Sequence, residues 1–319
     1  MIAAPLLVSY NSLEDYLSCL SSEMRKEHEQ EIRWLVDQKL PPVVSSRCLS
    51  VLFGYSAKFV NALALNNYNY YREFTIRKGN KRRKIQAPRV AIKVIQKWFG
   101  HHLSEVLPVE DYVYGFIPGR SAVDAAAQHC GASWVYSVDI ENFFPSTTDD
   151  VVIRALIEVG YSEKGARLIA RLCCFGDRLG QGAPSSPVLS NLVMKPIDIQ
   201  LKYIADNLGV NFTRYADDIV FSGKGGFPVE LRDRVLNVFE GTCWDLAENK
   251  EYFANSELGQ RLKVHGLLVN GEKPRLTKGY RNRVRAYKHL LENNRVKPGD
   301  KRRLIGHIKF AESVESWKE

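Results

Sequence analysis

The sequence predicts an α+β fold with an antiparallel sheet and a helical C-terminal part. Three short runs rich in apolar and β-branched residues, 133–139, 212–216 and 219–222, have the composition of strands, and the last two are close enough to form a hairpin. Segments with helical periodicity separate these strands, and two basic helical patterns end the chain. Strands mixed with helices around a hairpin are typical of an antiparallel α+β domain.

The elements are predicted from periodicity and from the Gly, Pro and capping residues that bound each segment. The expected helices are 12–38, 46–66 divided at Gly54, 90–106, 122–129, 149–159, 163–174, 187–208, 229–247, 278–292 and 301–315. Further strands are expected at 71–77 and 84–86, paired around Gly79-Asn80, and at 263–269. Ser185 or Ser186 fits the N-cap of the helix from 187, and 115–120 is expected to be a loop.

Length, charge and cysteine usage limit the class of protein. A chain of 319 residues, 45% hydrophobic, has room for two or three subdomains. The formal charge of +9 favours a polyanionic partner, and the cations gather in the stretches 77–84 and 273–309. The six cysteines lack C-x-x-C spacing, which indicates reduced thiols and no zinc site. No run is long enough to cross a bilayer, so we expect a cytoplasmic protein without a membrane partner.

Three aspartates are the candidate reactive groups. Asp139 ends an apolar run that breaks at Pro145, so a strand delivers its carboxylate. Asp217 and Asp218 lie between the two strands of the predicted hairpin. Like charges held side by side on a half-buried hairpin repel, which favours a cation nearby. An ordinary Asp-rich turn is the alternative for an isolated pair of this kind.

These residues resemble the motifs of an enzyme family. Tyr215-Ala216-Asp217-Asp218 resembles the Tyr-x-Asp-Asp box of reverse transcriptases, and Asp139 with Phe143-Phe144 resembles their first acidic motif. The loop 181–187 is similar to the loop between those two motifs. The whole stretch 71–268 resembles the group II intron-like reverse transcriptases of bacterial retrons.

The resemblance implies a right-hand polymerase with fingers, an antiparallel-sheet palm and a helical thumb. On that basis we expect an N-terminal helical extension at 1–70, fingers at 71–130, the palm at 131–268 and the thumb at 269–319. The resemblance is good over fingers and palm, looser over the thumb and almost absent over the N-terminal extension.

Two Mg²⁺ ions are the expected cofactors. In nucleotidyl transfer, two ions roughly 3.5 to 4 Å apart activate the attacking hydroxyl and neutralise the pyrophosphate, and Mg²⁺ prefers carboxylate oxygens. We predict that Asp139 and Asp217 are shared by both ions and that Asp218 is more peripheral, while the resemblance adds the backbone carbonyl of Ile140. Three acids nearby are interpreted as structural, because they fall at a strand break or in a first helical turn: Glu141, Asp149 and Asp150.

The resemblance also implies how a deoxynucleotide is bound. Phe144 matches the bulky residue under the sugar, which excludes a 2′-hydroxyl. Gln181 and Gly182 match the loop beneath the incoming base and the template, and Tyr215 belongs to the same substrate site.

Cations of the fingers are expected to hold the triphosphate. Guanidinium groups grip phosphate bidentately, so the candidates are Arg77 or Lys78 and, by preference, Arg83. The alternative is that this charge run is a solvated face. The expected general acid for pyrophosphate is Lys250, although the family usually has Asn-x-x-Lys where this chain reads Asn249-Lys250-Glu251-Tyr252.

Basic residues elsewhere are expected to bind nucleic acid. The cations of the two C-terminal helices alternate with aromatic residues, which suits phosphate and 2′-hydroxyl contacts to an A-form or hybrid duplex. The candidates there are Arg281, Arg285, Lys288 and Arg302. Arg120 lies in a loop similar to one that touches the template backbone in the family.

Two sequence marks of the retron family are altered in this chain. The motif Asn-Ala-x-x-His appears as Ala125-Ala126-Ala127-Gln128-His129, which lacks the Asn and keeps the His. The motif Val-Thr-Gly appears as Val264-His265-Gly266. For His129 a nucleic-acid contact is one expectation, and a structural role is the open alternative for both histidines.

The resemblance implies a retron reverse transcriptase that copies part of a structured noncoding RNA into single-stranded DNA, giving a branched product primed from an RNA 2′-hydroxyl. Its expected partners are that RNA, the cDNA product (msDNA), deoxynucleotides and an accessory effector protein in anti-phage defence. The alternatives are a group II intron-like or other defence reverse transcriptase, and a non-enzymatic RNA-binding scaffold that restrains a toxin.

Overall fold

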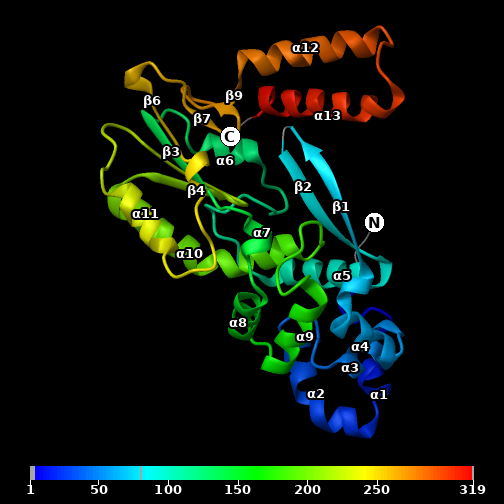
Figure 1. The fold of residues 1–319 in the computed structure, drawn as a ribbon. Coiled ribbons are helices and arrows are strands. Elements are labelled where there is room, and N and C mark those ends of the chain that lie inside the picture. The colour runs from blue at the N-terminus through cyan, green and yellow to red at the C-terminus, as the bar shows by residue number, and fades with distance from the viewer. Residues whose placement is uncertain (1–3, 80, 318–319) are drawn as a thin grey trace. The chain divides into compact units, whose positions relative to one another are not determined.

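The computed structural model describes residues 4–79 and 81–317, so Asn80 of the predicted hairpin turn lies outside the described residues. Its helices and antiparallel sheets confirm the α+β fold (Figure 1). The chain divides into two compact units. Unit 1 comprises the chain to Pro108, Glu141–Pro196 and Gly241–Trp244, and unit 2 comprises Val109–Ile140, Ile197–Glu240 and the chain from Asp245. The division into extension, fingers, palm and thumb stays a prediction.

Short helices open unit 1: α1 (Leu13–Ser18), α2 (Ser22–Asp37), α3 (Ser46–Phe53), α4 (Ala57–Leu65) and the 3₁₀ turn η1 (Asn67–Tyr70). The single helix predicted over 12–38 is wrong. The Ser21 hydroxyl accepts a hydrogen bond from the Met24 amide and caps α2, which separates it from α1. The division at Gly54 is confirmed, since Gly54 ends α3 with a φ of +65°.

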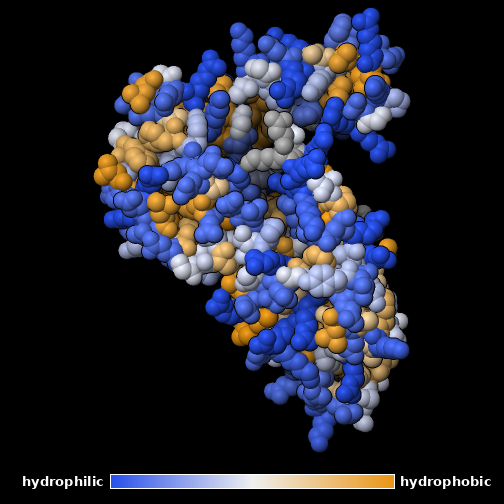
Figure 2. Space-filling view, viewed as in Figure 1, coloured by the Kyte–Doolittle hydropathy of each residue, from blue (hydrophilic) through white to orange (hydrophobic). Residues whose placement is uncertain are grey.

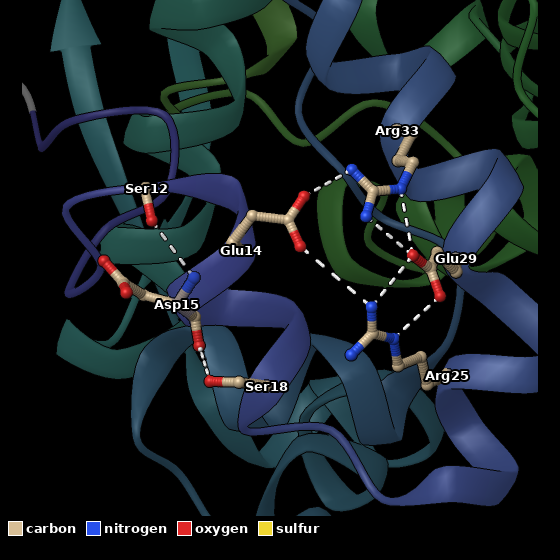
Figure 3. Close-up of polar contacts among 7 residues, drawn as sticks. All are labelled: Ser12, Glu14, Asp15, Ser18, Arg25, Glu29 and Arg33. Atoms are coloured by element: carbon tan, nitrogen blue, oxygen red, sulfur yellow. Dashed lines mark hydrogen bonds and ion pairs between the residues drawn. The ribbon is translucent and has the colours of Figure 1, made fainter.

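Charged side chains link α1 to α2 (Figure 3). The Arg33 guanidinium binds Glu14 of α1 at 2.6 Å and Glu29 of α2 at 2.7 Å, and Arg25 also binds Glu29 at 2.7 Å. Hydrogen bonds from Arg25 and Arg33 lower the pKa of Glu29 to about 2. These side chains are partly exposed, so the network contributes little to the free energy of unfolding.

The rest of unit 1 is a hairpin and a group of helices. β1 (Tyr71–Lys78) pairs antiparallel with β2 (Lys81–Pro88), so the second strand is longer than the predicted 84–86. The helices are α5 (Val90–Val106), α7 (Phe143–Ser146), α8 (Asp149–Val159), α9 (Glu163–Cys173) and the first part of α10 (Ser186–Leu208). The short α7 was not predicted because Pro145 indicated a break, but proline is tolerated in a first helical turn.

Among the residues that the structure describes, no single helix is long and apolar enough to cross a membrane. Helices α3 and α4 pass that test only as a pair bent by 119°. Their side chains Leu49, Leu52, Val60 and Leu63 are fully buried in the protein.

Unit 2 is built on an antiparallel sheet in the order β4–β5–β3–β6. The strands are β4 (Asn211–Tyr215), β5 (Asp218–Gly223), β3 (Trp134–Asp139) and β6 (Tyr252–Asn255). The first three confirm predicted strands, whereas β6 was not predicted. Bulky side chains fill the core around this sheet, and Trp134, Tyr136 and Phe221 are almost completely buried.

Helices complete unit 2 around the sheet: α6 (Ala122–Ala127), α11 (Leu231–Phe239) and the second part of α10. The helix predicted over 229–247 ends at Phe239, because Gly241 has a φ of +72° and does not continue it. A 3₁₀ turn, η2 (Glu248–Lys250), follows before β6.

The C-terminal part of unit 2 contains a small sheet and a helix pair. The strand predicted over 263–269 is instead the hairpin of β7 (Lys263–Val264) and β8 (Leu267–Leu268), since His265 and Gly266 have φ values of +49° and +80°. The 3₁₀ turn η3 (Ser256–Leu258), strand β9 (Arg275–Leu276) and helices α12 (Lys278–Glu292) and α13 (Pro298–Glu315) belong to the same region. Helices α12 and α13 lie side by side (Figure 1), and the surface over them is mostly hydrophilic (Figure 2).

Candidate active site

Strand pairing in unit 2 brings the three predicted aspartates to one end of the sheet. Asp139 is the last residue of β3, and its partner across the sheet is Asp218, the first residue of β5. Asp217 is next in the turn, and its carbonyl accepts a hydrogen bond of 3.0 Å from the Ile140 amide. Aspartates from two distant parts of the sequence therefore lie at the same end of the sheet.

The electrostatics of Asp139 reflect this crowding. Burial raises its pKa, and the negative charges of Asp217 and Asp218 raise it further. The hydrogen bond and the charge of the Lys250 ammonium lower the pKa of Asp139. Three aspartates therefore lie near a single lysine ammonium, which leaves an excess of negative charge.

Lys250 reaches Asp139 because the segment before it runs along the end of β3. The Ala247 amide donates to the Asp139 carbonyl at 2.8 Å, and Leu246 bridges to Ile140. The 3₁₀ turn η2 then places the Lys250 Nζ atom on Asp139 Oδ1. The shifted position of this lysine relative to the family motif therefore does not keep it away from the aspartates.

His265 also contacts the aspartates, which the sequence did not predict. Its Nδ1 lies 3.0 Å from Asp218 Oδ2, and its ring centroid lies 5.2 Å from that of Tyr215. The side chain is only 7% exposed, and its Nε2 is buried without a hydrogen-bond partner. The Gly that follows His265 was the available signal, because His-Gly with positive φ values fits a two-residue turn better than a strand.

The donor set fits a hard divalent cation in residue type. Carboxylate oxygens are the ligands that such ions prefer, and three of them converge here with unbalanced negative charge. Within the described residues, no three acidic, His or Cys side chains are placed to hold one metal ion. Asp139 is bound to Lys250 and Asp218 to His265. A cation held by Asp139 would take the place of the lysine ammonium.

In unit 1, the predicted nucleotide-binding loop packs on strand β2. Gln181 and Gln86 exchange two hydrogen bonds of 2.9 Å, from each backbone amide to an oxygen of the other residue. Gly182 has a φ of +119°, and a Cβ there would come within 2.9 Å of Ile85. The contact with β2 therefore requires glycine at 182.

The register of the hairpin separates the predicted fingers cations. Arg83 is opposite Ile76, and Arg77 is opposite Arg82. Opposite residues share a face and successive residues alternate, so Arg77 and Arg83 lie on opposite faces of the hairpin. Arg83 shares its face with Ile85, the residue next to Gly182. The side chain of Lys78, the other candidate, lies outside the described residues.

Phe143 and Phe144 differ in burial within unit 1. Phe143 is 5% exposed and packs in the core. Phe144 is half-buried, with its ring centroid 5.5 Å from that of Phe143. Asp149 and Asp150 begin α8, as predicted for first-turn acids.

Arg120 supports its own loop in unit 2. Its guanidinium donates to the carbonyls of Glu110 and Val113 and lies 5.6 Å from the centroid of the Tyr114 ring. The side chain that was predicted to touch a template is thus engaged within the protein.

His129 is a core residue, the second of the two alternatives that its sequence left open. It is fully buried, and its ring nitrogens lie 2.7 Å from Ser222 Oγ and 2.8 Å from Thr213 Oγ1. Burial lowers its pKa to about 3, so the ring is neutral. A ring without exposed surface does not contact a nucleic acid, and this expectation is corrected.

The predicted cations of the C-terminal helices are exposed. Arg281, Arg285 and Lys288 follow a spacing of four and three residues along α12, which places them on one face. Lys288 pairs with Glu312 of α13 at 3.4 Å, and Arg302 is exposed on α13. A cavity of about 460 Å³ beside the start of α12 is lined by Arg261, Lys273, Arg275, Lys278 and Arg281 among other residues.

Comparisons with known proteins identify relatives of this chain. Residues 76–243 match the family described as reverse transcriptase (RNA-dependent DNA polymerase). The Retron Ec86 reverse transcriptase of Escherichia coli is 29% identical, and the alignment covers 77% of each protein. The Retron Mx162 reverse transcriptase of Myxococcus xanthus is 30% identical over 80% of this chain and 60% of that protein.

A solved structure of telomerase from Candida albicans, in complex with a fragment of telomeric RNA, is a more distant match. It covers 70% of this chain and 50% of its own, with 10% identity and a TM-score of 0.47. That likeness is too partial to support an argument.

Proposed function

Since this chain belongs to the reverse transcriptase family, and within it to the retron enzymes, it is an RNA-directed DNA polymerase, and we propose that it copies part of a structured noncoding RNA into single-stranded DNA. Family membership makes an RNA template and deoxynucleotides its substrates.

The carboxylate cluster supports nucleotidyl transfer by two Mg²⁺ ions. Asp139, Asp217 and Asp218 would hold the ions, and the Ile140 carbonyl would add a ligand. When bound, the ions supply activation of the attacking hydroxyl and neutralisation of the leaving pyrophosphate. The cross-strand pairing of Asp139 with Asp218 is the observation that carries this proposal, since it gathers the ligands at one end of the sheet.

Lys250 would serve as the general acid. Its ammonium lies against Asp139, from where it would donate a proton to the pyrophosphate oxygen as the bond to the α-phosphorus breaks. Release from Asp139, once another cation takes that carboxylate, would free the ammonium for this step. Tyr215 lies beside the carboxylates and would contact the substrate.

The incoming deoxynucleotide would bind residues of unit 1. Arg83 is the favoured triphosphate ligand over Arg77, because Arg83 shares a hairpin face with the residue that contacts Gly182. Gln181 and Gly182 would lie beneath the base. The half-buried ring of Phe144 would exclude a ribose 2′-hydroxyl by its bulk.

The C-terminal helices would hold the template duplex. Arg281, Arg285 and Lys288 form an exposed stripe on α12, and Arg302 adds a cation on α13. Such contacts to phosphates and 2′-hydroxyls bind a duplex by its shape. Arg120 would act indirectly, by supporting the loop that approaches the template.

Variants at the carboxylates test the activity. We expect Asp139→Asn and Asp217→Asn to reduce Mg²⁺-dependent DNA synthesis on an RNA template to background, because an amide does not supply the charge that a divalent ligand requires. Glu141→Gln is the matched control, since Glu141 is a nearby acid that we interpret as structural, and it should keep normal synthesis. Undiminished synthesis by Asp217→Asn would reject the catalytic assignment.

The retron-specific part of the proposal concerns priming and partners. We propose that synthesis begins at a 2′-hydroxyl of the cognate RNA, that the product is msDNA, and that the protein acts in anti-phage defence with an effector protein. Sequence similarity to retron enzymes supports this proposal. Sequencing the nucleic acid that copurifies with the wild-type chain should yield a branched RNA–DNA molecule with a 2′–5′ linkage.

The same experiment distinguishes the alternatives. Intron RNA or linear cDNA would favour a group II intron-like or other defence enzyme. Bound RNA without any cDNA, together with no synthesis by the wild-type chain in vitro, would favour a scaffold that restrains a toxin.

A further inference from the structure

The turn that carries Asp217 and Asp218 has a backbone conformation that needs support. Strands β4 and β5 are joined by Ala216 and Asp217, with Tyr215 paired to Asp218 across the hairpin. Ala216 has a φ of +58°, in the left-handed region that favours glycine. Surrounding structure must hold such a residue in place, and residues of this kind gather at functional sites.

The buried guanidinium of Arg214, on strand β4, holds the turn by a hydrogen bond. Arg214 Nη1 donates to the Ala216 carbonyl at 3.1 Å. Its Nε and Nη2 atoms bind the two carboxylate oxygens of Asp198 on α10, at 2.6 and 2.7 Å. The side chains are 0% and 2% exposed. One planar group therefore ties α10 to the carbonyl at the tip of the turn.

A neighbouring segment, residues 112–115, also contacts the hairpin near the turn. Arg214 exchanges backbone hydrogen bonds of 2.9 Å with Tyr112 and Tyr114. Gly115 then passes so close that a Cβ there would lie 2.1 Å from the Ala216 amide nitrogen. The backbone at the turn is thus held by contacts with both this segment and the guanidinium.

Stability alone gives little reason for a buried ion pair of this kind. Removing two charges from water is costly, and apolar side chains of similar volume often stabilise a protein as well or better. Burial raises the pKa of Asp198, while the charge of Arg214 opposes that shift. What apolar side chains could not provide is the hydrogen bond to the Ala216 carbonyl.

We propose that Arg214, held by Asp198, is a positioning residue for the reaction: it fixes the Ala216 turn so that the carboxylates of Asp217 and Asp218 stand beside Asp139. Arg214 does not touch substrate or metal itself. This inference rests on the proposed function, because it assigns the aspartates their role there.

The double variant R214M/D198L separates positioning from folding. It removes both buried charges together, so we expect a cooperative unfolding transition near that of the wild type. Loss of the contact to the turn should lower kcat by about tenfold to a hundredfold, as for other groups that orient metal ligands. It should also raise the Mg²⁺ concentration that gives half-maximal activity. The KM for deoxynucleotides should change much less. A folded double variant with wild-type kcat and Mg²⁺ dependence would overturn the inference.

A second variant keeps the test decisive if the double variant does not fold. Arg214→Lys retains the positive charge beside Asp198, but one ammonium does not reproduce the planar contacts to both Asp198 and the turn. We expect a folded protein with the same loss in kcat, and wild-type kcat would again refute the positioning role. The matched control is K202Q/D206N, an exposed ion pair on the same helix, which should leave kcat unchanged.

The assays also distinguish failure of this inference from failure of the proposed function. If the wild-type chain makes no DNA on an RNA template, the proposed function itself fails. If the wild type is active, Asp217→Asn is inactive and the Arg214 variants match the wild type, only the positioning role fails.

Discussion

The His129 imidazole lies between two hydroxyls in the core and has a pKa lowered to about 3 by burial. In the unfolded chain the ring has its ordinary pKa of 6.5. As the pH falls from about 6.5 to about 3, the unfolded state therefore binds a proton that the folded state does not. The free energy of unfolding should decrease over that window and be unaffected by this ring above it.

Replacing His129 by Gln removes this titration. Between pH 7.5 and pH 5, the wild type should lose about 2 kcal/mol of unfolding free energy through His129. The variant should be less stable at pH 7.5, but its unfolding free energy should not show this additional decrease between pH 7.5 and pH 5. Urea unfolding of both proteins at the two pH values measures the difference. Parallel decreases in the two proteins would mean that His129 takes up a proton in the folded state.

His265 has a different role, because its ring contacts Asp218 rather than core hydroxyls. His265→Ala removes that contact and should lower DNA synthesis about tenfold or more. His265→Asn should retain much of the activity, since its amide can replace the Nδ1 donor. Steady-state kcat and Mg²⁺ half-saturation test this prediction. Equal losses in both variants would show that the ring only fills space.

At the level of elements, the β1–β2 hairpin presents its cations on two faces. Arg83 should contact the triphosphate and Arg77 should not, because only Arg83 shares the face next to Gly182. A hydrogen bond to a charged group contributes about 1.5 to 3 kcal/mol. We therefore expect Arg83→Gln to raise the KM for deoxynucleotides about tenfold or more.

Arg77→Gln is the matched control for this prediction. It removes the same charge from the same hairpin and should change the KM for deoxynucleotides by less than about threefold. A larger effect at Arg77 than at Arg83 would reverse the assignment of the two faces.

Periodicity predicted the elements whose burial pattern is regular, such as α5, α8 and α9, because a buried face requires that spacing. It missed β6, whose four residues become a strand only by pairing with β3. It also merged β7 and β8, since residues 263–269 satisfy an apolar strand pattern and only the positive φ values divide them.

The predicted site shows the same limit. The aspartates were expected to meet because each lies at a recognisable strand end or turn, and the register brings them together. His265 and the Arg214–Asp198 pair were not expected. Contacts between side chains distant in the sequence leave no spacing pattern by which a single sequence can reveal them.

At the level of the whole molecule, residues 4–70 pack against the rest of unit 1. The Tyr161 hydroxyl donates to the Pro41 carbonyl at 3.1 Å, and Asn67 donates to the Cys174 carbonyl at 2.8 Å. A Cβ at Gly165 would come within 2.6 Å of the Val43 carbonyl. The segment is therefore built into the fold on which α8 and α9 depend.

A chain that begins at Tyr71 should fail to fold cooperatively, because removing the segment exposes apolar surface on α9 and leaves backbone carbonyls unpaired. Circular dichroism and thermal unfolding measure this outcome. Arg33→Gln, which breaks the exposed network of α1 and α2, should leave the melting temperature nearly unchanged. A stable, cooperative truncated chain would show that the segment is a separate module.

Because Lys250 is paired with Asp139, binding of a divalent cation to this carboxylate would replace one cation by another. If Asp139 held a divalent cation, the Lys250 ammonium would give up this carboxylate, so the net charge of the site would change by less than if the carboxylate had no cationic partner. Without a bound divalent cation, the Lys250 ammonium partly neutralises the aspartates and so reduces their repulsion of a nucleic-acid backbone. On the proposed function, the ion pair would therefore let a nucleic acid approach the site before a divalent cation is bound.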